Sequence, residues 1–323
     1  MSAGTLRIGT RASALALWQA RHVEALLAAL PGAPRIELVH IRTAGDAQRE
    51  VPLWQTEGRA FFTREIDEAL GHGTIDVAVH SLKDLPTALA PGLTLGAALT
   101  REDPRDALLA REGESLRQLP PSARIGTSSL RRRAFIARIR PDAMPVELRG
   151  NVPTRIERLK RGDYDAIILA AAGLARLGLT QHVSEFLSPQ EFPPAVSQGV
   201  IGVCARADDE ATLGLLRSLD DTAARLAVSA ERALLARLEG GCQVPLGALA
   251  ELRGEPLELT AVVCALDGSR ELRARGTASA SRGATLTAAD AVALGERVAD
   301  ELLAAGAAEL IARERSRLVV AAP

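Results

Sequence analysis

Lysine and aromatic residues are scarce in this chain of 323 residues. Aromatic residues make up 2% of it, and of the 39 lysines and arginines only Lys83 and Lys160 are lysine. Nucleic-acid surfaces use stacking aromatics and a basic charge, whereas this chain has a formal net charge of −1. The sequence therefore predicts no nucleic-acid partner, a local role for its basic residues, and a specific reason for each lysine.

Cysteines are also few, and long apolar runs are lacking. Cys204, Cys242 and Cys264 are odd in number and far apart, which fits neither a disulfide framework nor a zinc site. No run is apolar enough to span a bilayer, and we find no N-terminal signal peptide. With 47% hydrophobic residues the chain can still build a core. We expect a soluble cytoplasmic protein with reduced thiols, no metal site and no membrane partner.

Strands and helices alternate in the first part of the chain. The pattern predicts a strand at 6–9, a helix at 14–30 with Ser13 as its N-cap, and a strand at 36–41. A further strand at 75–80 follows a short helix near 63–70. Between the strand at 36–41 and the short helix, residues 42–61 show no sustained period. This predicts a long loop, of which 47–59 is a candidate lid.

A second unit repeats the first in outline. The RIGT at Arg124 to Thr127 copies the RIGT at Arg7 to Thr10, and YDAIIL at 164–169 echoes IDVAVH at 75–80 as an apolar strand behind an aspartate. Alternation of this kind favours parallel sheets with ligand sites at the carboxyl ends of strands. We expect two similar α/β units that face a cleft.

A third α/β unit is predicted in the last part of the chain. Its expected elements are a helix at 222–238, strands at 257–264 and 270–277, and a helix at 287–304. A strand at 200–204, after a hinge at Pro193 and Pro194, could return to the first unit. The predicted domains are residues 1–99 with 200–217, residues 100–199, and residues 218–323.

Cys242 lies in the segment LEGGCQVPLG, between a predicted helix and a strand. Two glycines before it end the helix, and Pro245 prevents the helix from resuming. The thiol is thus predicted on a connection. Local sequence alone favours a small buried apolar cysteine over a reactive one.

A local excess of arginine marks the start of the second unit. Eight arginines lie between 124 and 155, at positions 124, 131, 132, 133, 138, 140, 149 and 155. Hydroxyls at Thr127 to Ser129 precede the helix that carries several of them, so donors, helix dipole and guanidinium groups converge. This favours an anion site, because arginine binds carboxylates and phosphates at two points. A solvated helix face accounts for Arg133, Arg138 and Arg140, whereas we assign Arg131, Arg132, Arg149 and Arg155 to the site.

Lys83 and Asp84 follow an apolar, hence buried, strand. A carboxylate at a strand end between α/β units is placed for acid–base chemistry or charge stabilisation. A turn aspartate before Pro86 is an equally good interpretation from the local sequence.

These segments together resemble the porphobilinogen deaminase (hydroxymethylbilane synthase) family, from about Leu6 to Gly306. The matching motifs are RIGTRAS (7–13) with ALALWQA after it, VAVHSLKDLP (77–86), REDPRDA (101–107), IGTSSLRRR (125–133), LRGNVPTR (148–155), YDAIILAAAGLARLGL (164–179) and LEGGCQVPLG (238–247). The resemblance implies two periplasmic-binding-protein-like (type II) α/β domains around a cleft, plus a smaller α/β domain that carries the cofactor cysteine.

The resemblance also implies an activity. A transferase of this kind joins four porphobilinogens head to tail, with loss of ammonia, on a covalently bound dipyrromethane, and water releases hydroxymethylbilane. Each pyrrole carries an acetate and a propionate, and the arginines would bind these carboxylates. A monomer is implied as well. The competing interpretation is a non-catalytic binding protein for carboxylates or other anions, which would carry no covalent cofactor.

The resemblance assigns roles to matching residues. Cys242 would carry the cofactor, and Asp84 with Lys83 would be catalytic. Further cofactor contacts would come from Lys83, Asp84, Ser13, Thr127, Ser129, Arg131, Arg132, Arg149 and Asn151. Substrate contacts would come from Arg11, Gln19, Phe62, Arg149, Arg155 and Arg176. One segment departs from the family, since EGRAFF at 57–62 replaces the usual GGKGLF and leaves Arg59 as the substituted cation.

Overall fold

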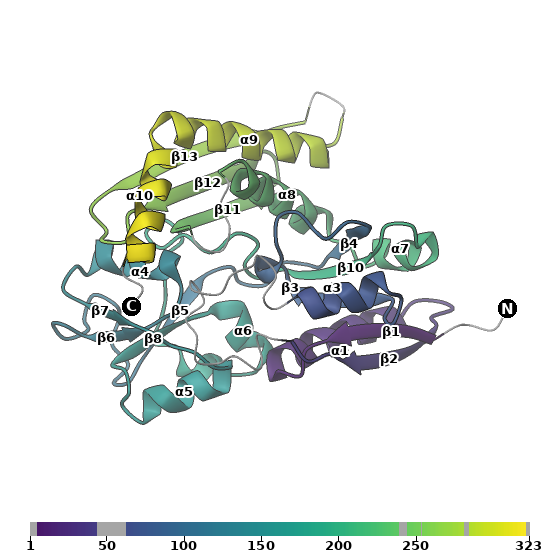
Figure 1. The fold of residues 1–323 in the computed structure, drawn as a ribbon, viewed down its shortest axis with the longest axis horizontal. Coiled ribbons are helices and arrows are strands. Elements are labelled where there is room, and N and C mark those ends of the chain that lie inside the picture. Colours follow the sequence, from purple (N-terminus) through teal and green to yellow (C-terminus); the bar gives the residue numbers. More distant parts are fainter. Residues whose placement is uncertain (1–4, 44–62, 239–243, 253, 281–283, 321–323) are drawn as a thin grey trace.

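The computed structural model describes residues 5–43, 63–238, 244–252, 254–280 and 284–320 (Figure 1). Within these residues the strands form two five-stranded sheets and one three-stranded sheet. In Figure 1 the three-stranded sheet and its helices lie above the other two units. Strands and helices alternate along the chain, as expected of an α/β protein.

The first sheet has the strand order β2-β1-β3-β10-β4. Its strands are β1 (Thr5–Thr10), β2 (Arg35–His40), β3 (Val77–Ser81), β4 (Leu93–Ala98) and β10 (Ile201–Arg206). β1 is parallel to β2 and β3, whereas β10 runs antiparallel to both β3 and β4. The predicted return of the chain to the first unit near residue 200 is therefore confirmed.

Three helices flank this sheet: α1 (Ala14–Ala28), α3 (Arg64–Gly71) and α7 (Glu210–Arg217). The Ser13 side chain caps α1 as predicted, because its Oγ accepts a hydrogen bond from Ala16 N at 3.3 Å. Ala20, Val23 and Leu27 recur at helical spacing and are fully buried against the strands.

The second sheet has the order β7-β6-β8-β5-β9. Its strands are β5 (Asp106–Ala110), β6 (Arg124–Gly126), β7 (Met144–Val146), β8 (Ala166–Ala170) and β9 (Glu185–Phe186). Its helices are α4 (Leu130–Ile139), α5 (Val152–Lys160), α6 (Ala171–Arg176) and the short 3-10 turn η3 (Thr180–His182). β5 has the same position in this sheet as β10 has in the first, next to the edge strand. It is antiparallel to β8, and in the sequence it directly follows β4 of the first unit.

The predicted repeat is confirmed in detail. Asp76 Oδ2 accepts from Arg7 N at 2.9 Å, and Asp165 Oδ2 accepts from Arg124 N at 2.8 Å, so each aspartate pairs with the arginine that begins its RIGT segment. The same aspartates return a backbone bond, each N–H donating to the carbonyl of that arginine at 2.9 Å. Both β3 and β8 begin two residues later than predicted, each directly after its aspartate.

Two crossover segments, 99–105 and 187–200, connect the units and touch one another. Glu102 N donates to Gly199 O at 3.1 Å. Gly199 has a φ of +93°, and a Cβ there would lie 2.3 Å from Glu102 O. Only glycine tolerates both the backbone conformation and this close approach.

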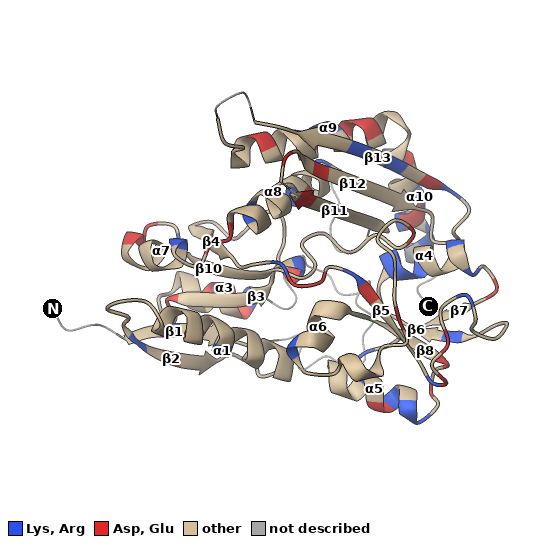
Figure 2. Cartoon of the chain, turned by 180° about the vertical axis from the view of Figure 1, so that it is seen from behind, with Lys and Arg blue, Asp and Glu red and all other residues tan. Residues whose placement is uncertain are grey.

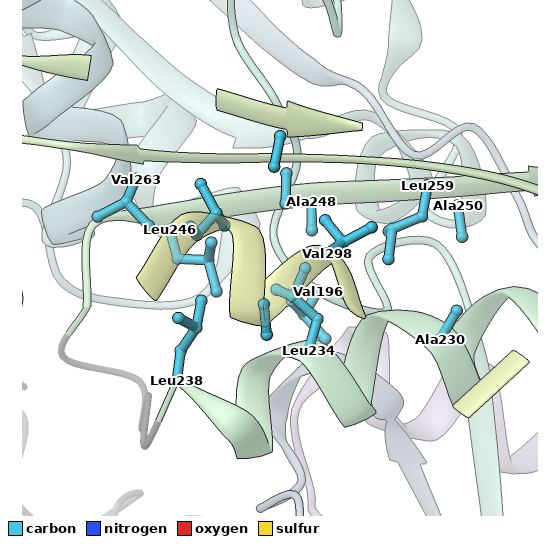
Figure 3. Packing of buried hydrophobic residues seen from close by; sticks show 14 of the residues in the cluster. Val196, Ala230, Leu234, Leu238, Leu246, Ala248, Ala250, Leu259, Val263 and Val298 are labelled. Atoms are coloured by element: carbon cyan, nitrogen blue, oxygen red, sulfur yellow. The ribbon is translucent and has the colours of Figure 1, made fainter. Parts of the chain in front are cut away.

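The third sheet consists of β11 (Leu246–Leu252), β12 (Leu257–Cys264) and β13 (Glu271–Ala278), all antiparallel. Its helices are α8 (Thr222–Arg237), α9 (Ala288–Ala304) and α10 (Ala307–Val320), of which α10 was not predicted. Figure 3 shows the core between sheet and helices, where Leu234 of α8, Leu259 of β12 and Val298 of α9 meet. Val196, from the second crossover, packs into the same core.

The central strand β12 presents its two faces to different units. Leu259, Ala261 and Val263 pack against the helices of the third unit. Val262 and Cys264 point the other way, into the core that contains Phe135 of α4. This alternation is the two-residue period of a strand buried on both sides. The third unit is thereby fixed to the second by hydrophobic contact.

Candidate active site

Lys83 and Asp84 lie where β3 ends. The strand is followed by one 3-10 turn, η2 (Leu82–Asp84), in which Leu82 is buried and Asp84 is exposed. A pocket opens at this point, and its polar lining consists of Arg11, Ser13, Gln19, Thr63, His80, Ser81 and Asp84. The structure thus brings together four of the predicted site residues, namely Arg11, Ser13, Gln19 and Asp84.

Two buried side chains form the wall of this pocket. Gln19 Nε2 donates to Ser81 Oγ at 2.8 Å, which fixes the amide of α1 against the end of β3. His80 is 6% exposed, and among the described residues its Nε2 has no hydrogen-bond partner. Burial, with a contribution from Arg11, lowers the pKa of His80 to about 4. The imidazole is therefore neutral at physiological pH, and the sequence interpretation had given it no role.

Lys83 is partly buried and points toward the second crossover. Its Nζ donates to Gln198 Oε1 at 3.1 Å. Burial lowers the pKa of Lys83 to about 8, although the neighbouring Asp84 carboxylate opposes this change. Most of the Lys83 side chains are therefore still protonated at neutral pH and can bind a carboxylate.

Arg131 and Arg132, both buried on α4, share the carboxylate of Asp106. Arg131 Nη2 donates to Asp106 Oδ2 at 2.7 Å, and Arg132 donates to Asp106 Oδ1 through Nε at 3.1 Å and Nη2 at 2.7 Å. Burial alone would raise the pKa of Asp106, but the two guanidinium groups hold it well below its usual range. Because two cations share one anion, the group keeps an excess positive charge. Figure 2 shows the basic α4 beside the acidic start of β5.

Arg149 and Arg155 add further positive charge next to this group. Nη1 of Arg149 is buried and, among the described residues, has no hydrogen-bond partner. Arg155 Nε donates to Gly150 O at 2.7 Å. Burial, together with the charges of Arg132 and Arg149, lowers the pKa of Arg155 to about 10, although Asp84 and Glu147 oppose this change. Arg155 is therefore within electrostatic range of Asp84, although it comes from the other unit.

Arg176 lies on α6 and is 9% exposed. Its Nη2 donates to Gly199 O at 2.6 Å, and its guanidinium carbon lies 5.9 Å from the centre of the Trp18 ring. Burial lowers the pKa of Arg176 to about 10. The residue thus connects the second unit to the second crossover and to α1.

The predicted hydroxyl and amide groups mostly cap helices. Ser129 Oγ accepts from Arg132 N at 3.4 Å at the start of α4, and Asn151 Oδ1 accepts from Thr154 N at 2.9 Å at the start of α5. Thr127 is buried, and its Oγ1 accepts from Ser129 N at 3.2 Å. These side chains fix the two helix N-termini that carry the site arginines.

Arg133, Arg138 and Arg140, which the sequence assigned to a solvated helix face, are partly or fully exposed and have charged partners. All three pair with carboxylates, those of Glu147, Glu271 and Asp142 respectively. Arg140 also donates to the carbonyls of Leu116, Leu119 and Pro120 and so closes the loop before β6. Charged partners that are distant in sequence cannot be read from the arginine pattern alone.

Three predicted residues fall outside the described residues. They are Cys242, Phe62 and the substituted cation Arg59, together with the candidate lid at 47–59. By its number, Cys242 belongs to the connection between α8 and β11.

Asp106 and Gln198 are site residues that the sequence interpretation missed. Asp106 stands in the motif REDPRDA, and Gln198 stands next to the glycine of the second crossover. Asp106 could have been suspected, since a pair of neighbouring arginines requires a carboxylate and Asp106 begins an apolar strand, whereas no sequence signal marked Gln198.

The residues that the structure describes contain neither a metal-binding cluster nor a membrane-spanning helix. No group of three or more His, Cys, Asp or Glu side chains there could hold a metal ion. None of the described helices is long and apolar enough to cross a membrane.

Two solved structures with similar chain paths share little sequence with this chain. The VFT2 domain of Bordetella pertussis BvgS aligns with a TM-score of 0.41 and 12% identity, covering 67% of this chain and 86% of that domain. The periplasmic aliphatic sulphonate binding protein SsuA of Escherichia coli aligns with a TM-score of 0.38 and 15% identity, covering 74% of this chain and 72% of SsuA.

Similarity in sequence is far closer to one family. A model described as "Porphobilinogen deaminase, dipyromethane cofactor binding domain" matches residues 6–214, and one described as "Porphobilinogen deaminase, C-terminal domain" matches residues 225–304. A porphobilinogen deaminase of Roseiflexus sp. (strain RS-1) is 53% identical over 309 residues, covering 95% of this chain and 99% of that protein. One of Syntrophotalea carbinolica is 47% identical over 314 residues, covering 97% and 96%. The predicted fold class is confirmed, with two α/β units of matching strand order and a third α/β unit, and the chain belongs to the porphobilinogen deaminase family of enzymes.

Proposed function

We propose that this protein joins four porphobilinogens head to tail and releases linear hydroxymethylbilane, as a hydroxymethylbilane synthase. Each addition breaks the C–N bond of a substrate aminomethyl group, forms a C–C bond to the pyrrole at the end of the chain, and releases ammonia. The observation that carries the proposal is the pocket at the end of β3, which Asp84 lines with Arg11, Ser13 and Gln19, within electrostatic range of Arg155 from the second unit.

Asp84 is the proposed general acid. It is exposed to the pocket at the end of β3, where it can deliver a proton to the leaving amine. Once ionised, the same carboxylate can face the positive charge that develops on the pyrrole nitrogen. One group can therefore serve both halves of the deamination step.

The cations are proposed to bind the acetate and propionate groups. Arg11 lines the pocket with Ser13 and Gln19, and we assign these residues to the incoming substrate together with Arg149, Arg155, Arg176 and Phe62. Arg149 supports this assignment, because its buried Nη1 has no hydrogen-bond partner among the described residues and a carboxylate would supply one.

The residues present fit a dipyrromethane with four carboxylates. Lys83, the arginine pair of α4 with its excess charge, and Arg149 would hold these carboxylates, with Ser13, Thr127, Ser129 and Asn151 assisting and Asp84 facing the pyrrole nitrogens. When bound, the cofactor supplies the pyrrole carbon to which the first substrate is joined. We propose Cys242 as its attachment point.

The other two cysteines support this choice. Cys204 and Cys264 are both buried, and burial raises the pKa of each thiol to about 12. A thiol that does not ionise is a poor nucleophile. Of the three cysteines in the chain, Cys242 is thus left as the one able to attack a methylene carbon.

Intact mass tests the proposal against a simple anion-binding protein. The purified chain should exceed its sequence mass by one covalent dipyrromethane, and Cys242→Ser should lack this increment. Cys204→Ala and Cys264→Ala are matched controls that should keep it. A parent protein of unmodified mass without deaminase activity would favour the binding protein instead.

We further propose a monomeric, cytoplasmic enzyme with domains at 1–99 with 200–217, at 100–199 and at 218–323. The three sheets support this division, because the strands of each sheet all come from one of these domains. Sedimentation equilibrium of the purified protein tests the monomer.

A further inference from the structure

We propose that Gln198 is a positioning residue for Lys83, and that its amide ties this cation to the Asp106 group of the second unit. The inference rests on the proposed function, in which Lys83 binds a carboxylate. Gln198 lies in the second crossover and is 1% exposed. Nothing in the arginine pattern or in the strand ends points to this residue.

The amide of Gln198 bridges the first unit and the first crossover. Its Oε1 accepts from Lys83 Nζ at 3.1 Å. Its Nε2 donates toward the carbonyl oxygens of Pro104 at 2.8 Å and Arg105 at 3.3 Å, and toward Asp106 Oδ1 at 3.1 Å. Every polar atom of the side chain is therefore in use.

These partners permit one orientation of the amide. A lysine ammonium can only donate hydrogen bonds, whereas carbonyl and carboxylate oxygens can only accept them. Reversing the amide would place an N–H against the ammonium and an oxygen against three acceptors. A neutral group with an acceptor at one end and donors at the other is needed here, and glutamine is such a group.

The bridge sets the separation between two groups of cations. Asp106 Oδ1, which accepts from Gln198, also accepts from Nε and Nη2 of Arg132. Lys83 and the α4 arginines are thus connected through two side chains, Gln198 and Asp106. A substrate or cofactor with several carboxylates needs its cations at fixed spacing, and this connection provides it.

The titration of Lys83 is the readout that a purely structural glutamine would not change. The charged groups that act on Lys83 are Asp84, Asp106, Arg131 and Arg132, and none of these residues is changed in a Gln198 variant. The chain has only two lysines, so [¹³Cε]lysine labelling gives two resolved side-chain signals. Lys160, which pairs with Glu157 on the surface, is the internal control.

Gln198→Met keeps the length of the side chain and removes both ends of the bridge. Because the protonated lysine loses its acceptor, we expect the Lys83 midpoint to fall by about one pH unit, roughly tenfold in the protonation constant. The Lys160 signal should not move. Gln118→Met, a change of an exposed glutamine that binds Ser115, should leave both midpoints unchanged.

Gln198→Glu is the second variant and separates the proposal from general damage. It keeps an acceptor for Lys83 and adds a negative charge, so the Lys83 midpoint should rise instead of fall. An unchanged midpoint in either folded variant, or a change of the same sign in both, would overturn the proposal. If Gln198→Met does not fold, the direction observed in Gln198→Glu decides.

The Lys83 titrations of parent and variants are comparable only if all samples carry the same amount of covalent cofactor. Intact mass shows whether parent and variants carry the same increment, and where they differ the titrations are repeated with Cys242→Ser added to each. A parent without any increment would contradict the proposed function, yet the Lys83 titration would still decide the role of Gln198.

Discussion

Arg101 and Glu231 join the first crossover to the third unit through a two-point ion pair. Arg101 Nη1 lies 2.7 Å from Glu231 Oε1, and Nη2 lies 3.0 Å from Oε2. The same carboxylate, which is fully buried, also accepts from Ser197 N of the second crossover and from Ala250 N of β11. One glutamate thereby holds both crossovers against the third unit.

Glu231→Ala should therefore destabilise the protein strongly. Removing one partner of a buried pair leaves an uncompensated charge, and we expect a loss of about 3–5 kcal/mol in the free energy of unfolding. Urea unfolding followed by circular dichroism measures it. Glu210→Ala, which breaks the exposed pair with Arg217, should cost less than about 1 kcal/mol. Equal losses in the two variants would contradict the role given to Glu231.

Asp84→Asn should fold and, when supplied with preassembled tetrapyrrole, carry the cofactor, but it should turn over very slowly. The amide keeps the size of the carboxylate, yet it can neither donate an acidic proton nor carry a negative charge. We expect the steady-state rate to fall by about 10²–10⁴-fold. Asp208→Asn, an exposed change in the turn after β10, is the control and should keep parental activity. A loss of less than about tenfold for Asp84→Asn would move the proton transfer to another group.

Lys83→Arg should lose activity although the charge is kept. The Lys83 ammonium fits between Asp84 and the single acceptor on Gln198, whereas a guanidinium is broader and needs paired acceptors. Displacement of the cation should lower kcat/KM on the order of 10²-fold. Lys160→Arg, on the exposed face of α5, is the matched exchange and should have no effect. Comparable activity in both variants would show that Lys83 is not required as lysine.

Asp106→Asn should destabilise the protein in a pH-dependent way. The folded pKa of Asp106 lies below its ordinary value of 3.8, so its stabilising effect is complete above that value and is lost as the pH falls through the folded pKa. The difference in unfolding free energy between parent and Asp106→Asn should be large at pH 7 and shrink below pH 3.8. Asp300→Asn, which breaks an exposed pair with Arg237, should show a small difference at both pH values. A difference for Asp106→Asn that does not change with pH would contradict this account.

Local patterns were sufficient for most of the fold. Helical spacing, Ser13 before α1 and the RIGT repeat predicted many of the elements that the structure contains, because caps, turns and burial of one face act over a few residues. The helices α6, α7 and α10 and the strands β4, β5 and β11 were not predicted. The short strands β7 and β9 were missed because two or three residues show no period.

The site was predicted less completely, and for a physical reason. Asp84 and the arginines stand in motifs, so their residue types could be assigned to acid–base and anion-binding roles. Gln198 and Asp106 act through partners that are 115 and 26 residues away, Lys83 and Arg132 respectively. Such pairings arise from the crossovers, which bring distant segments together, and a linear pattern does not contain them.

The position of β10 between β3 and β4 also constrains how the chain can be made. In the described sheets β4 pairs only with β10, which the ribosome produces after the whole second sheet. Before β10 is made, the edges of β3 and β4 with which it will pair are both exposed, and such edges invite pairing with other chains. We therefore expect a chain that stops before Ile201 to aggregate, because the strand that covers these edges never arrives.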